Sequence, residues 1–399
     1  MTSPVAVSFR HVDIVFGDQP QTVLPLLNAG ASRSRILEET DHVLGVADAC
    51  LDVREGDICV VMGLSGSGKS TLIRAVNGLS GVVRGEVLVR DGEDMIDVTT
   101  CDVATLRRVR MYCVAMVFQQ FALFPWLTVE ENAGFGLELA RMDAKERSRR
   151  VDEQLALVDL EQWSGKYVHE LSGGMQQRVG LARAFATDAP ILLMDEPFSA
   201  LDPLIRARLQ DELLELQKAL RKTIIFVSHD LDEALKIGNH IVILEEGRIV
   251  QHGMPQDIVL NPVDSYVTQF VSHTNPLNVL DGASLMTGLD TLPREDGRVM
   301  LDHNCQLTIS LDTDGVARKP MLDGKAIEFA SLDQALANPD AMRHKLVNAP
   351  VVTTIRDIIE ARLVTRLPVL LNDADLAVGI VHDKEIYGGL LPGRLTGNS

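Results

Sequence analysis

The sequence predicts an α/β protein built on a mostly parallel sheet. Four short apolar runs indicate strands that are buried on both faces: Ile58–Met62, Ile191–Met194, Thr223–Val227 and Ile241–Leu244. Stretches of helical character, such as Arg206–Leu220, alternate with these strands. Because successive parallel strands need a crossover connection between them, this alternation favours an α/β fold.

Length and charge restrict the possible functions. The chain has 399 residues, enough for about two or three domains that each bury a core. Apolar residues at 46% and charged residues at 24% exclude a disordered, collagen-like or coiled-coil chain. Because 38 Lys and Arg face 56 Asp and Glu, the net charge is −18. We expect no nucleic-acid partner, since neutralising phosphates needs a basic surface.

The cysteines do not form a recognisable framework. They are Cys50, Cys59, Cys101, Cys113 and Cys305. Their number is odd and no pair has CxxC spacing, which argues against a disulfide-rich fold and against a zinc site. We expect buried thiols in a reducing cytosol.

The sequence also lacks a recognisable membrane segment. Residues 1–18 contain no basic region followed by an apolar stretch, so no secretory signal is predicted. The most apolar stretch, Met111–Leu127, is interrupted by Gln119, Gln120 and Pro125, and a spanning helix needs roughly 20 apolar residues. We therefore expect a cytosolic protein that does not itself form a membrane pore.

The first part of the chain contains an insertion. Val5–Phe9 and Val12–Phe16 are predicted strands. Residues 20–44 then interrupt the α/β pattern with two apolar clusters around a polar centre. We predict an inserted helix or loop with no chemistry of its own.

A phosphate-binding loop follows the strand Ile58–Met62. The loop fits G-x-x-x-x-G-K-[ST] and precedes a helix-permissive run. Its glycines let backbone N–H groups converge on phosphate oxygens, and the helix directs its positive end at the same anion. Lys69 would reach the β- and γ-phosphates of ATP, and Ser70 would hold Mg²⁺. The predicted nucleotide-binding residues are Gly63, Leu64, Ser65, Gly66, Ser67, Gly68, Lys69, Ser70 and Thr71.

Two carboxylates follow the buried strand Ile191–Met194. Asp195 and Glu196 would lie in the ligand crevice, because carboxyl ends of parallel strands meet there. Asp195 would complete the Mg²⁺ site. Glu196 would polarise the attacking water.

The segment Leu171–Arg178 contains the N-terminus of a second helix that could bind an anion. Ser172, Gly173 and Gly174 open an amphipathic helix that also includes Gln176. A helix N-terminus favours an anion, so the chain carries a second candidate phosphate contact besides the phosphate loop.

With this segment the sequence resembles the ATP-binding cassette (ABC) ATPases over about residues 1–270. The resemblance implies a P-loop NTPase fold with a helical subdomain at about 127–171. In this family the signature, here Ser172–Gly174 with Gln176, closes over ATP held by the opposite subunit. The resemblance therefore implies a head-to-tail homodimer of ATPase domains with two ATP molecules at the interface.

Four further positions match family motifs. Gln119 matches the glutamine that touches Mg²⁺ and the attacking water, and His229 matches the switch histidine that contacts the γ-phosphate. Asp202, in Ser199-Ala200-Leu201-Asp202, matches the loop that faces the other subunit. Phe16 is the candidate for the aromatic side chain that stacks on adenine. The implied catalytic residues are Glu196, His229, Gln119 and Lys69, and the implied metal residues are Ser70, Gln119 and Asp195.

The details of several motifs most resemble importers of quaternary-ammonium osmoprotectants such as glycine betaine, proline betaine and choline. These motifs are Met62–Lys69, Phe198–Arg206 and Asp230–Ala234. The resemblance implies a peripheral ATPase on the cytoplasmic face of the inner membrane. A membrane permease would be its direct partner, and a substrate-binding protein an indirect one. Aromatic residues are only 4% of the chain, so a cation–π cage for the substrate is expected elsewhere.

Two alternatives stay open. An importer ATPase for amino acids or another small solute would share every catalytic residue. A non-transport regulator that binds ATP would signal through its C-terminal domain and would not associate with a membrane protein.

Residues 276–399 form a second predicted domain, after Asn261–Pro262 and Asn275–Pro276 mark the end of the first. Residues 351–391 resemble one cystathionine-β-synthase (CBS) module, and a degenerate first module is expected around Cys305–Asp333. Family modules that bind adenine nucleotides have Ser or Thr and Asp where this chain has His382 and Glu385. A sensor of ionic strength or nucleotide and a dimerisation or docking module are both open interpretations.

Overall fold

The computed structural model describes residues 3–199, 201–272, 277, 279–302, 306–338 and 342–390. Asn275, Pro276, Ala200, Cys305 and Leu391 of the sequence predictions lie outside these residues. The chain forms two compact units, divided between Met254 and Pro255. The sequence predicts a boundary near residue 270, whereas α10 (Pro255–Leu260) and α11 (Ser265–Val271) pack on each other within the second unit.

The first unit contains a four-stranded antiparallel sheet in the order β2-β1-β4-β5. Its strands are β1 (Val5–Phe16), β2 (Val43–Arg54), β4 (Arg84–Asp91) and β5 (Asp94–Asp97). The prediction of two separate strands in β1 is wrong. The pairing of β1 with β2 shifts register between Phe9 and Val12, where His11 has φ +50°. The polar residues in this interval form an irregularity within one strand.

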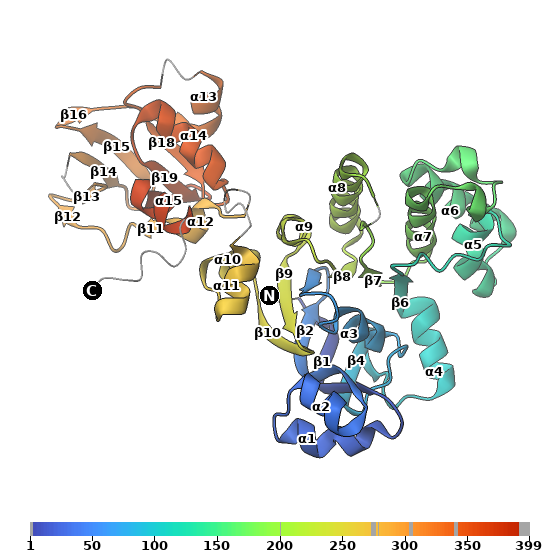
Figure 1. The fold of residues 1–399 in the computed structure, drawn as a ribbon. Coiled ribbons are helices and arrows are strands. Elements are labelled where there is room, and N and C mark those ends of the chain that lie inside the picture. The colour runs from blue at the N-terminus through green and yellow to red at the C-terminus, as the bar shows by residue number, and fades with distance from the viewer. Residues whose placement is uncertain are drawn as a thin grey trace. The chain divides into compact units, whose positions relative to one another are not determined.

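The second sheet has six strands in the order β10-β9-β3-β8-β7-β6. Its inner strands are parallel and only β10 is antiparallel, which confirms the predicted mostly parallel sheet. Figure 1 shows helices α3, α8 and α9 alternating with these strands along the chain. The bounds are β3 (Ile58–Met62), β6 (Val114–Val117), β7 (Ile191–Asp195), β8 (Thr223–Val227), β9 (His240–Glu245), β10 (Arg248–Gly253), α3 (Lys69–Val76), α8 (Pro203–Leu220) and α9 (Leu231–Ile237).

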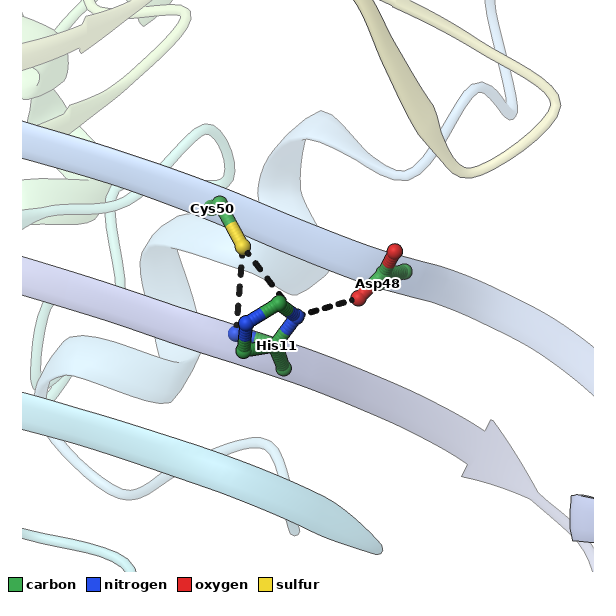
Figure 2. A group of neighbouring side chains, drawn as sticks. All are labelled: His11, Asp48 and Cys50. Carbon is green, nitrogen blue, oxygen red and sulfur yellow. Dashed lines mark hydrogen bonds and ion pairs between the residues drawn. The ribbon is translucent and has the colours of Figure 1, made fainter. Parts of the chain in front are cut away.

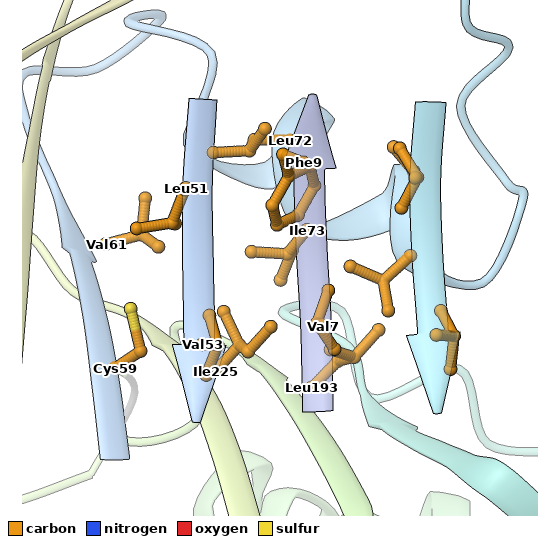
Figure 3. Packing of buried hydrophobic residues seen from close by; sticks show 14 of the residues in the cluster. Val7, Phe9, Leu51, Val53, Cys59, Val61, Leu72, Ile73, Leu193 and Ile225 are labelled. Carbon is orange, nitrogen blue, oxygen red and sulfur yellow. The ribbon is translucent and has the colours of Figure 1, made fainter. Parts of the chain in front are cut away.

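The main core lies between the two sheets and α3. Figure 3 shows side chains of β1, β2 and β3 packed together with Leu72 and Ile73 of α3. The side chains of Leu193 and Ile225 join them from β7 and β8. This packing fixes the carboxyl ends of the parallel strands against the start of α3, where the predicted nucleotide site lies.

The insertion folds against the first sheet. It contains η1 (Pro20–Val23), α1 (Leu24–Asn28) and α2 (Arg33–Thr40), which confirms its predicted partly helical character. Buried residues of the insertion and of β1 and β2 form a separate small core: Val15, Val23, Leu27, Ala31, Ile36, Leu44 and Ala47.

A helical group lies between β6 and β7 along the chain. Helices α5 and α6 both pack on α7. Thr128 and Glu131 form a capping box at the start of α5, each side chain bonding the other's backbone. Of the helices that the structure describes, none combines the length and apolar character that a membrane crossing needs. The group contains α5 (Val129–Leu139), α6 (Ala144–Leu157), η3 (Glu161–Trp163), η4 (Val168–Glu170) and α7 (Gly173–Ala186). Before β6, the chain forms α4 (Val103–Arg108) and η2 (Val109–Cys113).

The second unit has two five-stranded sheets. One has the mixed order β11-β20-β19-β18-β17 and the other is the antiparallel meander β12-β13-β14-β15-β16. The bounds are α12 (Gly282–Leu285), β11 (Thr287–Gly288), β12 (Arg294–Glu295), β13 (Arg298–Met300), β14 (Leu307–Leu311), β15 (Ala317–Leu322), β16 (Lys325–Ala326), β17 (Phe329–Ser331), α13 (Leu332–Ala337), β18 (Leu346–Pro350), α14 (Ile355–Thr365), β19 (Val369–Asp373), β20 (Leu376–Val381) and α15 (Asp383–Leu390).

The later part of this unit follows the order β18-α14-β19-β20-α15, as expected for the predicted second module. The earlier part does not repeat this order. Where the degenerate first module was expected, β14 and β15 belong to the meander, and only β17 belongs to the mixed sheet, with α13 packed against it. The second unit therefore has one regular strand–helix module, and an antiparallel meander precedes this module in the sequence.

Candidate functional site

The predicted site residues come together because neighbouring parallel strands end at one edge of the sheet. Lys69 follows β3, Gln119 follows β6, Glu196 follows β7 and His229 follows β8. These strands are adjacent in the sheet order β3-β8-β7-β6. Ligands of open parallel sheets bind at this edge, outside the carboxyl ends of the strands.

The phosphate loop needs glycine at its two ends. Gly63 has φ +142° and Gly68 has φ +105°, which other residues rarely adopt. A Cβ atom at Gly63 would overlap the carbonyl oxygen of Leu244, and one at Gly68 would overlap the carbonyl oxygen of Gly45. The loop is therefore fixed against neighbouring backbone, and α3 starts directly after it.

Lys69 is the first residue of α3, and its side chain reaches back to the loop. Its side chain is buried, and Nζ donates to the carbonyl oxygens of Gly63 at 2.9 Å and Leu64 at 3.0 Å. Burial lowers the pKa of the Lys69 ammonium, and the carboxylates of Glu196 and Asp195 oppose this shift. A cation at this position suits the phosphate groups of a nucleotide.

Ser70 and Asp195 form the pair that was predicted to hold the metal. Ser70 Oγ donates to Asp195 Oδ1 at 2.6 Å. Arg74 Nη2 donates to Asp195 Oδ2 at 2.8 Å, and the Asp195 side chain has no exposed surface. Both carboxylate oxygens of Asp195 therefore have partners within the fold.

Glu196 lies between two polar side chains. Gln119 Nε2 donates to Glu196 Oε2 at 3.1 Å, and His229 Nδ1 lies 3.4 Å from the same oxygen. The Glu196 side chain is 17% exposed, and its backbone has φ +50°. The structure thus brings three of the four predicted catalytic side chains into direct contact, and Gln119 donates its hydrogen bond to Glu196 rather than to Asp195 of the predicted metal site.

The signature residues form the N-terminus of α7. Ser172 Oγ accepts from the backbone N–H of Met175 at 3.4 Å, and both Ser172 and Gly173 are exposed. A Cβ atom at Gly173 would meet open space. The Gln176 side chain turns inward, where Nε2 donates to the carbonyl oxygens of Val168 and Leu171. Asp202 is exposed and caps α8 by accepting from Ile205 N–H at 3.1 Å.

Strand pairing brings Phe16 to the phosphate loop despite the insertion. Phe16 pairs with Val43 at the end of the β1–β2 ladder. The Phe16 ring and the Thr71 methyl group both approach the place where Gly45 would carry a Cβ atom. The ring is therefore beside the start of α3, and Phe16 remains 45% exposed.

The insertion contributes a contact that the sequence analysis missed. Arg33 Nη1 in α2 donates to the carbonyl oxygen of Gly66 in the phosphate loop. The expectation that this segment has no chemistry of its own overlooked this contact. No sequence signal identified Arg33, because the contact depends on how the insertion folds back on β1 and β2.

The donors at this edge fit a nucleotide triphosphate and a hard cation. Ser67 Oγ is buried in the loop, and among the described residues it has no hydrogen-bond partner. A phosphate oxygen would satisfy this hydroxyl group. The Ser70 hydroxyl and the Asp195 carboxylate are oxygen donors of the kind that Mg²⁺ prefers. The arrangement combines an anion cradle with a carboxylate that can polarise water.

In the second unit, the side chain of Glu385, which stands where nucleotide-binding modules have Asp, already has hydrogen-bond partners within the fold. Glu385 Oε1 accepts from Thr287 Oγ1 at 2.8 Å, and Oε2 accepts from His382 N–H at 3.0 Å. These hydrogen bonds help to keep the pKa of the Glu385 carboxyl below its ordinary value, although partial burial acts in the opposite direction. The Met286 side chain also packs over Gly379.

Comparison with known proteins agrees with this geometry. The sequence profile of the ABC transporter family matches residues 46–199. The glycine betaine transport ATP-binding protein OpuAA of Bacillus subtilis (strain 168) is 41% identical over 99% of this chain and 94% of its own. The glycine betaine/proline betaine transport system ATP-binding protein ProV of Escherichia coli (strain K12) is 49% identical over 97% of this chain and 95% of its own.

A solved structure agrees with the fold of the first unit. The ATP-binding cassette MJ0796, a dimer in a post-hydrolysis state bound to ADP and Pi, aligns with a TM-score of 0.54 at 30% identity. The alignment covers 62% of this chain and 98% of the cassette. From the full-length similarity to two relatives and the phosphate-loop geometry, the chain belongs to the ABC transporter family and carries its ATP-binding ATPase domain.

Proposed function

We propose that this chain is the ATP-hydrolysing subunit of an importer for quaternary-ammonium osmoprotectants of the glycine betaine type. The observation that carries the substrate class is its similarity, over both units, to two betaine transport ATP-binding proteins. The contacts of Glu196 with Gln119 and His229 support hydrolysis.

In this proposal, the phosphate loop and Lys69 bind the β- and γ-phosphates of ATP. Ser70, Asp195 and Gln119 would hold Mg²⁺, which would neutralise charge on the phosphate oxygens. Glu196 accepts the proton of the attacking water, and its contact with Gln119 and His229 orients the carboxylate. Phe16 stacks on adenine, since its ring lies beside Thr71 at the start of the loop helix.

Hydrolysis requires a second copy of the chain in this proposal. Ser172 and Gly173 are exposed, and the start of α7 offers an N-terminus to an anion outside its own subunit. Each signature would complete the ATP site of the other subunit. The dimeric arrangement in the cassette MJ0796 supports this assignment.

A groove lined by Phe118, the residue before Gln119, supports docking to a membrane permease on the cytoplasmic face. The groove has a volume of about 470 Å³ and lies between β6 and the helical group. Its apolar lining includes Met116, Phe118, Phe124 and Phe135. Trp126, close by in sequence, is 69% exposed. A permease segment in this groove would contact the same connection that carries Gln119, and a substrate-binding protein would act through the permease.

For the second unit, we infer a dimerisation or docking module rather than a nucleotide sensor. Both oxygens of the Glu385 carboxylate already accept hydrogen bonds within the fold, and the Met286 side chain covers Gly379. Neither position is therefore open to a nucleotide. Titration of AMP into a full-length variant with both Lys69→Ala and Phe16→Ala, which removes the phosphate contact and the proposed adenine stack of the first unit, should give no binding. Saturable binding of AMP to that variant would contradict the inference.

The transport proposal is tested in proteoliposomes that contain this chain, the permease that copurifies with it and the matching binding protein. We expect ATP-dependent uptake of labelled glycine betaine and none with the Glu196→Gln subunit. Uptake of labelled amino acids instead would favour the alternative importer. Failure to recover any permease from detergent-solubilised membranes would favour a non-transport regulator.

A further inference from the structure

Three potential metal ligands meet on the antiparallel sheet, away from the phosphate loop. They are His11 of β1 and Asp48 and Cys50 of β2, which Figure 2 shows converging between the two strands. All three residues are exposed, and their ligand atoms lie within 4.8 Å of one another. The ATPase mechanism proposed above uses none of them.

Both Asp48 and Cys50 lie close to the same ring nitrogen of His11, Nδ1. His11 Nδ1 lies 2.8 Å from Asp48 Oδ1 and 3.5 Å from Cys50 Sγ. Cys50 Sγ also accepts a hydrogen bond from the backbone N–H of His11 at 3.3 Å. The carboxylate and the thiol therefore approach the same side of the imidazole.

This convergence does not suit a proton relay. In a catalytic triad, the base uses one ring nitrogen toward the nucleophile and the other toward the carboxylate. Here Asp48 and Cys50 share Nδ1. A proton on Nδ1 that is donated to Asp48 leaves no lone pair there for the thiol. One cation between the three atoms would satisfy all of them.

The spacing suits a tetrahedral thiophilic ion. With bonds of about 2.05 Å to nitrogen and about 2.3 Å to sulfur, two ligands at the tetrahedral angle lie about 3.6 Å apart. The Nδ1 to Sγ distance of 3.5 Å is close to this value. The Nδ1 to Oδ1 distance would open from 2.8 Å to about 3.3 Å, which a small side-chain rotation provides.

The fold behind the cluster fixes two of the ligands. His11 lies in the register irregularity of β1, and both His11 and Asp48 have φ +50°. The backbone N–H of Asp48 donates to buried Asp13 Oδ1 at 2.8 Å, and Asp13 in turn pairs with Arg84. Such partners behind the ligands orient them for a metal.

Among the described cysteines, Cys50 is the exposed one. Burial raises the pKa of the Cys59 thiol to about 12 and that of the Cys113 thiol to about 11, so neither forms a thiolate readily. Cys50 and His11 also line a pocket of about 550 Å³ that gives a hydrated cation access. His240 and His252 line the same pocket and form a separate pair, with ring nitrogens 3.1 Å apart.

We propose that His11, Asp48 and Cys50 bind one thiophilic divalent cation of the zinc class. Water would complete the coordination, because the exposed side of the cluster faces solvent. On binding, the Cys50 thiol releases its proton to solvent, and the neutral His11 ring exchanges its Nδ1 proton through solvent for one on Nε2, so that the Nδ1 lone pair is free. The Asp48–His11 hydrogen bond then gives way to one bond from each residue to the metal. No electron is transferred. The absence of CxxC spacing did not exclude this site, since strand pairing assembles it.

The test titrates Co²⁺ and Zn²⁺ into the purified, reduced full-length chain without nucleotide. We expect a thiolate-to-cobalt absorption band that saturates at one equivalent and is displaced by Zn²⁺. Cys50→Ala should abolish the band. Asp48→Asn and His11→Gln should each raise the Kd by about tenfold or more, since even residues behind a ligand contribute about 10–100-fold. Zn²⁺ should also protect Cys50, but not Cys101, from alkylation, as read by mass spectrometry.

His252→Gln is the matched control, because it removes a histidine of the same pocket outside the cluster. It should leave the Co²⁺ band and the Kd unchanged. Thermal unfolding of each variant without metal shows whether it is folded. If Cys50→Ala and Cys50→Ser fold and retain the band, or if His252→Gln removes it, the ligand assignment is wrong. Absence of any band with the wild-type chain would also overturn it.

Discussion

Replacing Glu196 with glutamine should stop ATP hydrolysis and leave nucleotide binding intact. Glutamine has almost the same shape and keeps one oxygen to accept the hydrogen bond from Gln119 Nε2. It cannot take a proton from water. The phosphate loop, which binds the nucleotide, keeps all its own contacts.

The size of the loss follows from the surroundings of the carboxylate. A positioned general base contributes about 10²–10⁴-fold to a rate, or about 3–5 kcal/mol of barrier. Asp195 is the neighbouring carboxylate, but Ser70 and Arg74 already occupy its two oxygens. Because Asp195 is not free to replace Glu196, we expect the upper part of this range.

The assay measures kcat and the Kd for ATP on the purified full-length chain, with the oligomeric state by size-exclusion chromatography. We expect Glu196→Gln to lower kcat by about 10³-fold or more. The variant should keep the wild-type Kd and accumulate as an ATP-bound dimer. Glu138→Gln, an exposed change on α5, is the matched control and should behave as wild type. Turnover within tenfold of wild type would refute the role of Glu196 as base.

Three other substitutions test contacts described above. Phe16→Ala should weaken ATP binding by about 1–3 kcal/mol, the range for base stacking, and Phe16→Tyr should restore it; an unchanged Kd for the alanine variant would contradict the stacking role. Arg33→Ala should raise the Kd for ATP by about 2–12-fold with kcat unchanged, because it removes one hydrogen bond to the phosphate loop; a fall in kcat alone would assign Arg33 elsewhere. Gly379→Ala should destabilise the second unit by about 1–3 kcal/mol in urea denaturation, because its Cβ would overlap Met286. Wild-type stability of the second unit in the Gly379→Ala variant would exclude the overlap.

The sequence predicted the parallel sheet well, because strands buried on both faces are continuous apolar runs, and this pattern is visible in each segment by itself. The polar interval around His11 was misinterpreted as a break between strands. Irregular pairing with β2 carries the strand through this interval, and a single-strand pattern contains no information about the partner's register.

The candidate site was predictable where a motif fixes the chemistry, as at Lys69 and Ser70. It was not predictable where a contact depends on folding of the insertion, as for Arg33, or on side-chain rotation, as for Gln176. Phe16 shows the reverse case. The insertion separates Phe16 from the loop in sequence, but antiparallel pairing of β1 with β2 brings its ring back beside the start of α3.

The left-handed backbone at Glu196 has a consequence for the evolution of this chain. A residue with a Cβ atom at φ +50° costs roughly 1–2 kcal/mol, which glycine would not incur. Selection for thermal stability alone would therefore enrich Glu196→Gly while eliminating turnover. Laboratory evolution of this protein therefore needs an activity screen in every round, because thermal stability favours glycine at position 196 whereas ATP hydrolysis requires glutamate there.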